Sequence, residues 1–504
     1  MNLSSITPLG LSKYHLLGFY LLTIALSANI LGLPDLTRRI ILKTSFPTTK
    51  LTHVDKISST HYYCNFAFYG TAFANLVLEY VYFFEHPKIN FIFLGVSVII
   101  GLTLFTIKPL TSPVLYLAVI FLSTSSFFVF RSFLSIQELW PSHTEVINDI
   151  IGAATEISIL VPYLWLISMK YLSRSNNISY IISTYTIIYA GYMVFQVFLV
   201  PNDHFDNYIT PELRNEIDKE PVLEVVLINY ICRRSIIKKF SDKTSLLMFD
   251  NVTLLDNHSI VEKFIDPLYW LMCLTMAIVI FTKFHIALTF RLTLDYLAGN
   301  SIFYQKVINF LSELLNIFLG FSFFPTLILT HVAERTSCCL LTFICSISTT
   351  LAMLCYSIPL IIPQIFTIIF IWLSSTLIYN YLFIATQDYF GGSFVAISQL
   401  ISGTLSSIFG IMYPSIMTFF NEPFISRLSP DGQLVMWPTI KIFSIQIHTM
   451  YIVNICFTIM ASFTILVAYY EYSLIVTKKK KLLDEHSQSL VKSKSFAIPI
   501  AHNE

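Results

Sequence analysis

The sequence is poor in charged residues and in glycine. Only 12% of its 504 residues are charged, the formal net charge is +1, and 15 residues are glycine. Soluble domains carry about 25% charged residues. A surface facing water needs that polar cover, which this chain lacks. A net charge near zero also gives no electrostatic basis for binding nucleic acid. These shortages exclude a soluble globular class and a nucleic-acid partner.

Motifs of enzymes and metal sites are also missing. The eight cysteines form no CxxC or Cys/His spacing, so each is interpreted as a small hydrophobe. No H-E-x-x-H, G-x-S-x-G or D-x-D motif and no glycine-rich phosphate loop occurs. We therefore predict no catalytic residue, no bound metal and no cofactor. A polytopic membrane enzyme stays the least favoured alternative, because it needs acidic or histidine side chains gathered on one membrane face.

Apolar sequence is what the chain has in abundance. Hydrophobic residues make up 55% of it, including 44 Phe and 28 Tyr, and the mean hydropathy is +0.69. A helix needs about 20 mostly apolar residues to cross a bilayer, and its backbone satisfies its own hydrogen bonds there. Apolar runs of this length lie near 16–33, 62–84, 90–107, 113–134, 150–169, 178–200, 264–290, 307–331, 337–358, 361–386, 393–419 and 443–474. The sequence predicts an all-α integral membrane protein with about twelve transmembrane helices.

The runs fall into two groups of six. We predict an N-terminal six-helix half (1–200), a cytoplasmic central loop (201–263), a C-terminal six-helix half (264–474) and a disordered cytoplasmic tail (475–504). Two halves of this kind are typical of secondary transporters, which are often built from internal repeats. The halves share no clear sequence repeat, so this division depends on hydropathy alone.

Short stretches of the second half resemble a known family. The segment 381–390 is similar to the end of the tenth span in the neutral-amino-acid branch of the major facilitator superfamily (solute carrier family forty-three and related fungal proteins). Gly391-Gly392 and the segment 400–403 resemble the start of its eleventh span. The entry Asp266-Pro267 is equally similar to a monocarboxylate-transporter-like branch. The resemblance implies the major facilitator fold and transport of a small organic solute, either a neutral amino acid or a monocarboxylate.

The first half departs from that family pattern. Between spans two and three the superfamily carries G-x-x-x-D-[RK]-x-G-[RP]-[RK], a loop that latches helices in one state of the transport cycle. Here the segment 79–88 keeps only Pro87-Lys88. Two interpretations remain: a divergent transporter with another latch, or a non-transporting receptor or scaffold on a transporter fold.

Polar and ionisable residues inside apolar runs are the candidate functional residues, since charge is costly in a bilayer. In the resembling fold, spans one, four, seven and ten line the path. The predicted substrate-binding residues are therefore Asn29, His285, Tyr379 and Asn380. Glu156 and Glu313 are predicted coupling residues. For Glu156 the alternatives are pairing with a cation or a helix start at the membrane interface, and for His285 a hydrogen bond to a neighbouring helix.

The central loop contains a short sorting pattern. Asp242, Leu246 and Leu247 fit [DE]xxxL[LI], a carboxylate and two leucines that a sorting adaptor recognises. It favours a vacuolar or other endomembrane address, with the plasma membrane as the alternative. The distribution of Lys and Arg gives opposing signals for orientation. The expected partners are a small solute, the lipid bilayer and a sorting adaptor, and the expected state is a monomer.

Overall fold

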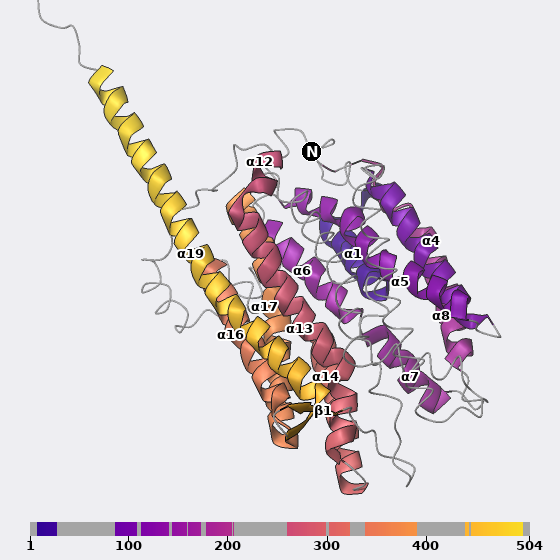
Figure 1. Ribbon diagram of the computed structural model, residues 1–504. Coiled ribbons are helices and arrows are strands. Elements are labelled where there is room, and N and C mark those ends of the chain that lie inside the picture. The colour runs from indigo at the N-terminus through magenta and orange to yellow at the C-terminus, as the bar shows by residue number, and fades with distance from the viewer. Residues whose placement is uncertain are drawn as a thin grey trace, which may run out of the picture.

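A computed structural model shows a chain made almost entirely of helices (Figure 1). The structure describes residues 8–27, 86–107, 112–140, 144–158, 160–172, 178–203, 205, 260–298, 302–322, 338–390, 439–442 and 445–496.

The first half contains six α-helices and two short 3-10 helices among its described residues. They are η2 (Pro8–Gly10), α1 (Lys13–Ser27), α4 (Pro87–Thr106), α5 (Ser112–Phe133), η3 (Leu134–Leu139), α6 (Thr144–Ile157), α7 (Leu160–Leu172) and α8 (Ile178–Gln196).

The second half is introduced by a short helix that begins within the last residues of the central loop. Its described elements are α12 (Ile260–Ile265), α13 (Pro267–Ala298), α14 (Ile302–Gly320), α16 (Cys338–Ser357), α17 (Ile361–Phe390), β1 (Thr439–Ile442), β2 (Ile445–His448) and α19 (Thr449–Phe496).

These helices correspond to the predicted spans. In the described part of the chain, seven segments are long and apolar enough to cross a membrane. Every predicted run except 62–84 and 393–419 is occupied by a described helix, and those two lie outside the described residues. Large apolar side chains such as Ile187 and Ile362 are more than two-thirds exposed. Lipid is the solvent that such a surface requires.

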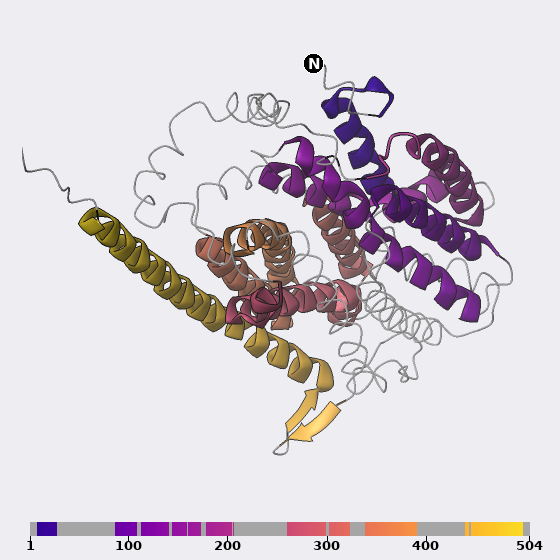
Figure 2. The ribbon, with the colours of Figure 1, turned by 90° about the horizontal axis from the view of Figure 1, so that it is seen from above.

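The helices separate into two groups. Helices α1, α4, α5 and α8 lie together, and α13, α14, α16, α17 and α19 form the second group, as the views from the side and from above agree (Figures 1 and 2). Helices α6 and α7 lie where the groups meet: α6 contacts α14 and α17, and α7 contacts α14. The interface between the halves therefore runs along these helices.

Hydrogen bonds join helices within the first half. The Tyr20 hydroxyl donates to the carbonyl of Leu199 at 3.1 Å, beyond the end of α8. The Ser125 hydroxyl of α5 donates to the carbonyl of Ser27 of α1 at 3.0 Å. Polar side chains of this kind hold transmembrane helices together because lipid offers them no other partner.

The second half has its own set of cross-helix hydrogen bonds. Tyr356 of α16 bonds Thr289 of α13 at 2.7 Å. Ser357 of α16 lies 3.1 Å from Thr458 of α19. The Tyr389 hydroxyl of α17 donates to Glu471 of α19 at 2.9 Å. Each half is thus internally bonded, which favours its motion as a unit.

Helix α12 and the C-terminal end of α19 lie toward the same end of the helix bundle (Figure 1). Here the buried Lys263 donates to the last carbonyl of α17, at Phe390, over 2.8 Å. Lys478 forms an ion pair with Asp266, which also caps α13 through the N–H of Leu268. These contacts fix the end of the central loop to the second half.

The last helix differs from the prediction in two ways. Residues 439–442 and 445–448 pair as two antiparallel strands, so α19 starts at Thr449 and not near 443. The helix then continues to Phe496, through most of the tail predicted to be disordered. The segment 478–496 contains no Gly or Pro and begins with four lysines and two leucines, which are good helix formers. Its 48 residues measure about 72 Å, far more than a bilayer core of ~30 Å.

Glycine allows one close approach inside the first half. A Cβ added at Gly101 of α4 would lie 2.6 Å from Leu122 Cγ and 3.1 Å from the carbonyl oxygen of Ala118, both on α5. Gly191 of α8 has nothing within 4 Å of the same position. We expect Gly101→Ala to destabilise the protein by about 1–3 kcal/mol through overpacking. Gly191→Ala should be neutral or stabilising, since alanine favours helix. Thermal unfolding in detergent measures both, and equal shifts would contradict the packing argument.

Candidate functional site

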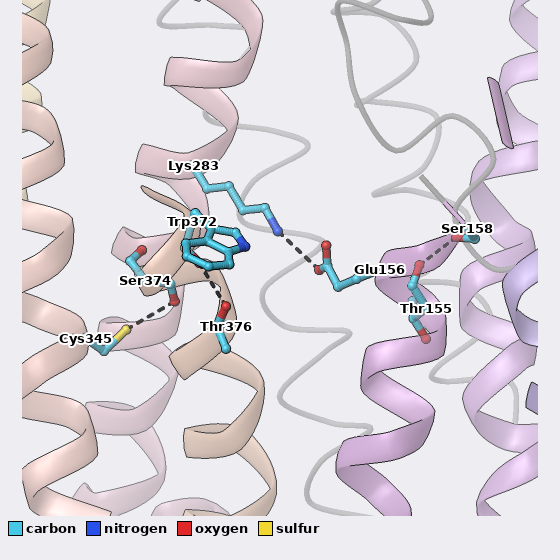
Figure 3. A network of polar contacts seen from close by, with 8 residues as sticks. All are labelled: Thr155, Glu156, Ser158, Lys283, Cys345, Trp372, Ser374 and Thr376. Atoms are coloured by element: carbon cyan, nitrogen blue, oxygen red, sulfur yellow. Dashed lines mark hydrogen bonds and ion pairs between the residues drawn. The ribbon is translucent and has the colours of Figure 1, made fainter. Parts of the chain in front are cut away.

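A buried ion pair joins the two halves. The ammonium of Lys283, on α13, lies 3.2 Å from Glu156 Oε1, on α6 (Figure 3). The side chains are 12% and 2% exposed. We call this contact the inter-half ion pair. Of the alternatives for Glu156, pairing with a cation is the one seen here.

The ion pair lies well inside the membrane-spanning region. Glu156 belongs to the apolar segment Ile150–Ser168, and Lys283 to Pro267–Ala287. An unpaired charge at the centre of a transmembrane helix costs ~2.5–3.5 kcal/mol on insertion scales. Each charge therefore stabilises the other in this position. The second carboxylate oxygen, Glu156 Oε2, is buried and has no hydrogen-bond partner among the described residues.

Lys283 and His285 face different neighbours. Two residues apart on a helix means directions about 200° apart. Lys283 faces α6 of the first half. His285 is fully buried against the second half: its Nε2 lies 2.9 Å from Asn454 Oδ1 of α19, and its ring stacks on Phe457 at 4.2 Å. The contacts of His285 match the alternative of a hydrogen bond to a neighbouring helix, and its assignment to a substrate site stays a prediction.

The first helix of the fifth span ends one residue after Glu156. Helix α6 ends at Ile157 and α7 begins at Leu160. Pro162 has no N–H to donate to the carbonyl of Ser158, and its ring clashes with that carbonyl in a regular helix. The carbonyl of Ser158 instead accepts a tight-turn hydrogen bond from the N–H of Val161, at 3.1 Å.

Two hydroxyl side chains form hydrogen bonds with backbone carbonyls in the last turns of α6. Ser158 donates to the carbonyl of Thr155 at 2.6 Å (Figure 3). Thr155 donates to the carbonyl of Ile151 at 3.0 Å. Such side-chain bonds to the preceding turn bend helices. They also satisfy backbone groups that a break would leave exposed to lipid. The interruption next to Glu156 is therefore encoded by Pro162, Ser158 and Thr155.

Trp372 of α17 has a buried ring nitrogen. Figure 3 shows its indole on α17, with the ring nitrogen turned toward the α6 side. That N–H is buried and has no hydrogen-bond acceptor among the described residues. The ring packs edge-on against Phe318 of α14, with centroids 5.1 Å apart. The ion pair thus joins α13 and α6, and a buried indole donor on α17 is turned toward the same side.

One face of α14 is turned toward the first half. A Cβ at Gly320 would meet the side chain of Leu160, on α7, at 2.2 Å. Glu313 and Asn316 precede Gly320 by seven and four residues, so they share its face. Asn316 is buried, and Glu313 is half-buried. The second predicted coupling residue therefore lies along the same interface as Glu156.

Only some of the other predicted site residues lie in the described part of the chain. Tyr379 and Asn380 belong to α17, two turns beyond Trp372. Asn29 and the sorting residues Asp242, Leu246 and Leu247 lie outside the described residues. Among the described residues, no three His, Cys, Asp or Glu side chains gather as a metal site.

The sequence did not predict the pairing itself. Lys283 is visible as a charge in an apolar run, opposite in sign to Glu156, and that is the signal from which a pair could be proposed. Trp372 carries no such signal, because tryptophan is common in membrane helices.

Comparison with known proteins shows the fold. No protein-family model and no curated protein matches the chain. Solved structures do. A bacterial homologue of the iron transporter ferroportin, in an outward-facing state, is 12% identical with a TM-score of 0.51, over 92% of this chain and 99% of that chain. The nucleoside transporter NupG is 10% identical with a TM-score of 0.50, over 92% and 98%. A peptide transporter POT in complex with sulfate is 10% identical with a TM-score of 0.50, over 93% and 99%.

At such identities the likeness concerns the fold alone. The chain is an all-α, multi-pass membrane protein with the fold of these structures, and the predicted fold class is confirmed.

Proposed function

We propose that this protein is a transporter that moves a small organic solute across the membrane by alternating access. In this mechanism two halves rock about a site near the bilayer midplane and expose it to one side at a time. The halves of the proposal are residues 1–200 and 264–474, joined by the central loop 201–263.

The observation that carries the proposal is the inter-half ion pair. Each half is joined internally by hydrogen bonds, while Glu156 and Lys283 meet across the interface, away from water. If the two halves never separated, apolar residues at these positions would give the same stability, because a buried ion pair is often no more stabilising than a hydrophobic replacement. A pair that is hydrated in one state and buried in another has a role in a protein that alternates between them.

The proposed substrate is a neutral amino acid or a monocarboxylate. The family resemblance supports this class, and so does the charge at the interface. Lys283 offers a cation to a carboxylate, and Trp372 offers a further hydrogen-bond donor with no partner among the described residues. Glu156 balances the charge when no substrate is present. We further propose an endomembrane location, with the vacuole favoured.

Uptake by reconstituted vesicles tests the proposal. The purified protein is inserted into liposomes and offered a panel of labelled neutral amino acids and monocarboxylates. We expect saturable uptake of at least one solute above the level of protein-free liposomes, and its loss in Lys283→Met. The exposed Lys306, near the start of α14, supplies the matched control, since Lys306→Met removes the same charge from a side chain that is not buried. Folded protein that takes up no solute would favour the receptor or scaffold alternative, to which the altered loop at 79–88 points.

A further inference from the structure

We propose that α12 is an interfacial helix that holds the end of the central loop on the lipid bilayer. Its partner is the boundary between lipid headgroups and acyl chains, on the side of the membrane where α13 begins. The inference goes beyond transport, because it concerns where the bilayer meets the second half. It holds equally for a transporter and for a receptor on this fold.

The side chains of α12 are distributed in the reverse of the way expected in water. Val261 and Ile265, four residues apart on one side of the helix, are 67% and 68% exposed. Lys263 lies on the opposite side, is fully buried, and donates to the carbonyl of Phe390 at 2.8 Å. A helix at the surface of a soluble protein buries its apolar stripe and exposes its charges. An exposed apolar side of this kind requires lipid as its solvent.

An aromatic contact connects this apolar side with α13. The ring of Phe264, next to Ile265, lies edge-on to Trp270, with centroids 5.3 Å apart. Trp270 is in the first turn of α13 and is 46% exposed. Tryptophan is enriched at the membrane–water interface, because its ring is apolar and its N–H is polar. We call the exposed side chains of Val261, Ile265 and Trp270 the α12 surface.

The α12 surface lies at the edge of a membrane span (Figure 1). Ile265 is two positions before Pro267, where both α13 and the apolar segment Pro267–Ala287 begin. Two residues cover at most about 7 Å, and the six residues of α12 measure about 9 Å. Interfacial helices bury their apolar side about 5–10 Å into the boundary of headgroups and acyl chains. The lipid around the spans is therefore within reach of the α12 surface.

Polar contacts hold α12 at this depth. Lys263 is bonded to the end of α17, and Asp266, between α12 and α13, pairs with Lys478 of α19. Lys478 is the last residue of the apolar segment Tyr451–Lys478. The start of one span and the end of another thus meet beside α12. The buried cation of α12 is bound within the protein, and its apolar side chains are left for lipid.

The accessibility of spin labels in proteoliposomes tests the proposal. Single cysteines at Val261 and Ile265 are labelled in a background whose eight native cysteines are replaced and whose thermal stability is unchanged. Oxygen concentrates in lipid, whereas a nickel chelate stays in water. We expect both labels to collide several-fold more with oxygen than with the chelate, as a label at the lipid-exposed Ile187 does. A label at Asp203, which is exposed beyond the end of α8, is the water reference.

A pair of double variants tests the apolar side itself. Val261→Asn/Ile265→Asn removes it, and Val261→Leu/Ile265→Leu is the matched control that keeps it. A label at the exposed Glu262 reports on both variants. We expect the asparagine variant to raise the collisions of this label with the nickel chelate several-fold, and the leucine variant to leave them unchanged.

Quenching of Trp270 by brominated lipid gives a readout that requires no cysteine. The difference between the protein and its Trp270→Phe variant isolates this residue, and we expect stronger quenching by bromine near the headgroup than by bromine at the chain end. Labels at Val261 and Ile265 that collide mainly with the nickel chelate would overturn the proposal in favour of water. Labels protected from both reagents would overturn it in favour of a covering protein segment. Neither readout involves uptake, so a failure of the proposed function leaves this result standing.

Discussion

Lys283→Met is expected to abolish uptake and to lower the thermal stability of the protein. The change leaves Glu156 buried without its cation, and removing one partner of a buried ion pair costs about 3–5 kcal/mol. The closed arrangement of the halves is disfavoured by that amount, which corresponds to a change of ~100-fold or more in its population relative to the open one. Initial uptake rates in vesicles and thermal unfolding in detergent measure the two effects.

Exchanging the two charges distinguishes the effect of the ion pair from the effect of each residue alone. Glu156→Lys alone places two cations together and should be at least as harmful as Lys283→Met. Combining it with Lys283→Glu restores opposite charges, and we expect this double variant to recover most of the stability. Because the exchanged side chains differ in length, recovery within about tenfold in uptake is sufficient. If the double variant behaves as the sum of its single changes, the contact between the halves has no energetic role.

His285→Leu is expected to destabilise the second half while leaving the apparent affinity for solute unchanged. The change removes the bond to Asn454 and leaves that amide buried without its partner. Hydrogen bonds between membrane helices are worth ~0.6 kcal/mol on average and at most about 1.7. We therefore expect a lower unfolding temperature, corresponding to a loss of about 0.6–1.7 kcal/mol, and less folded protein available for uptake.

The double variant His285→Leu/Asn454→Leu tests whether His285 has a structural role or binds substrate. Replacing both partners by apolar groups can be nearly neutral, because no polar group is left unmatched. Stability and uptake should then return toward the unchanged protein. A raised half-saturation concentration that the second substitution fails to correct would instead place His285 in the substrate site, as the sequence predicts.

The sequence anticipates the architecture but not the contacts. Hydropathy depends on residues close together in the chain, so the spans could be found from runs of apolar residues. The partner of Glu156 is 127 positions away along the chain. Lys283 and His285 look alike in the sequence, as neighbouring charged or titratable groups in one span. Only the packing of α13 shows that the first faces α6 and the second faces α19.

At the end of the chain, the sequence analysis predicted disorder where the structure has a helix. The polar, basic segment after Lys478 was interpreted as disordered because it cannot bury an apolar face. It lacks helix breakers, however, and it continues a helix already formed in the membrane. Extending an existing helix avoids the free-energy cost of nucleation. The helix propensity of these residues is therefore sufficient to keep them helical.

By itself the sequence determined that the chain crosses a membrane many times as helices, since 55% hydrophobic residues with 12% charge leave no other solvent for its surface. It also located the rare charges inside the spans. The tertiary structure decided which of these charges meet. It placed Glu156 against Lys283 across the two halves, beside a break in the fifth span. The physical reason is that pairing depends on the direction in which each helix face points, and only packing fixes that direction.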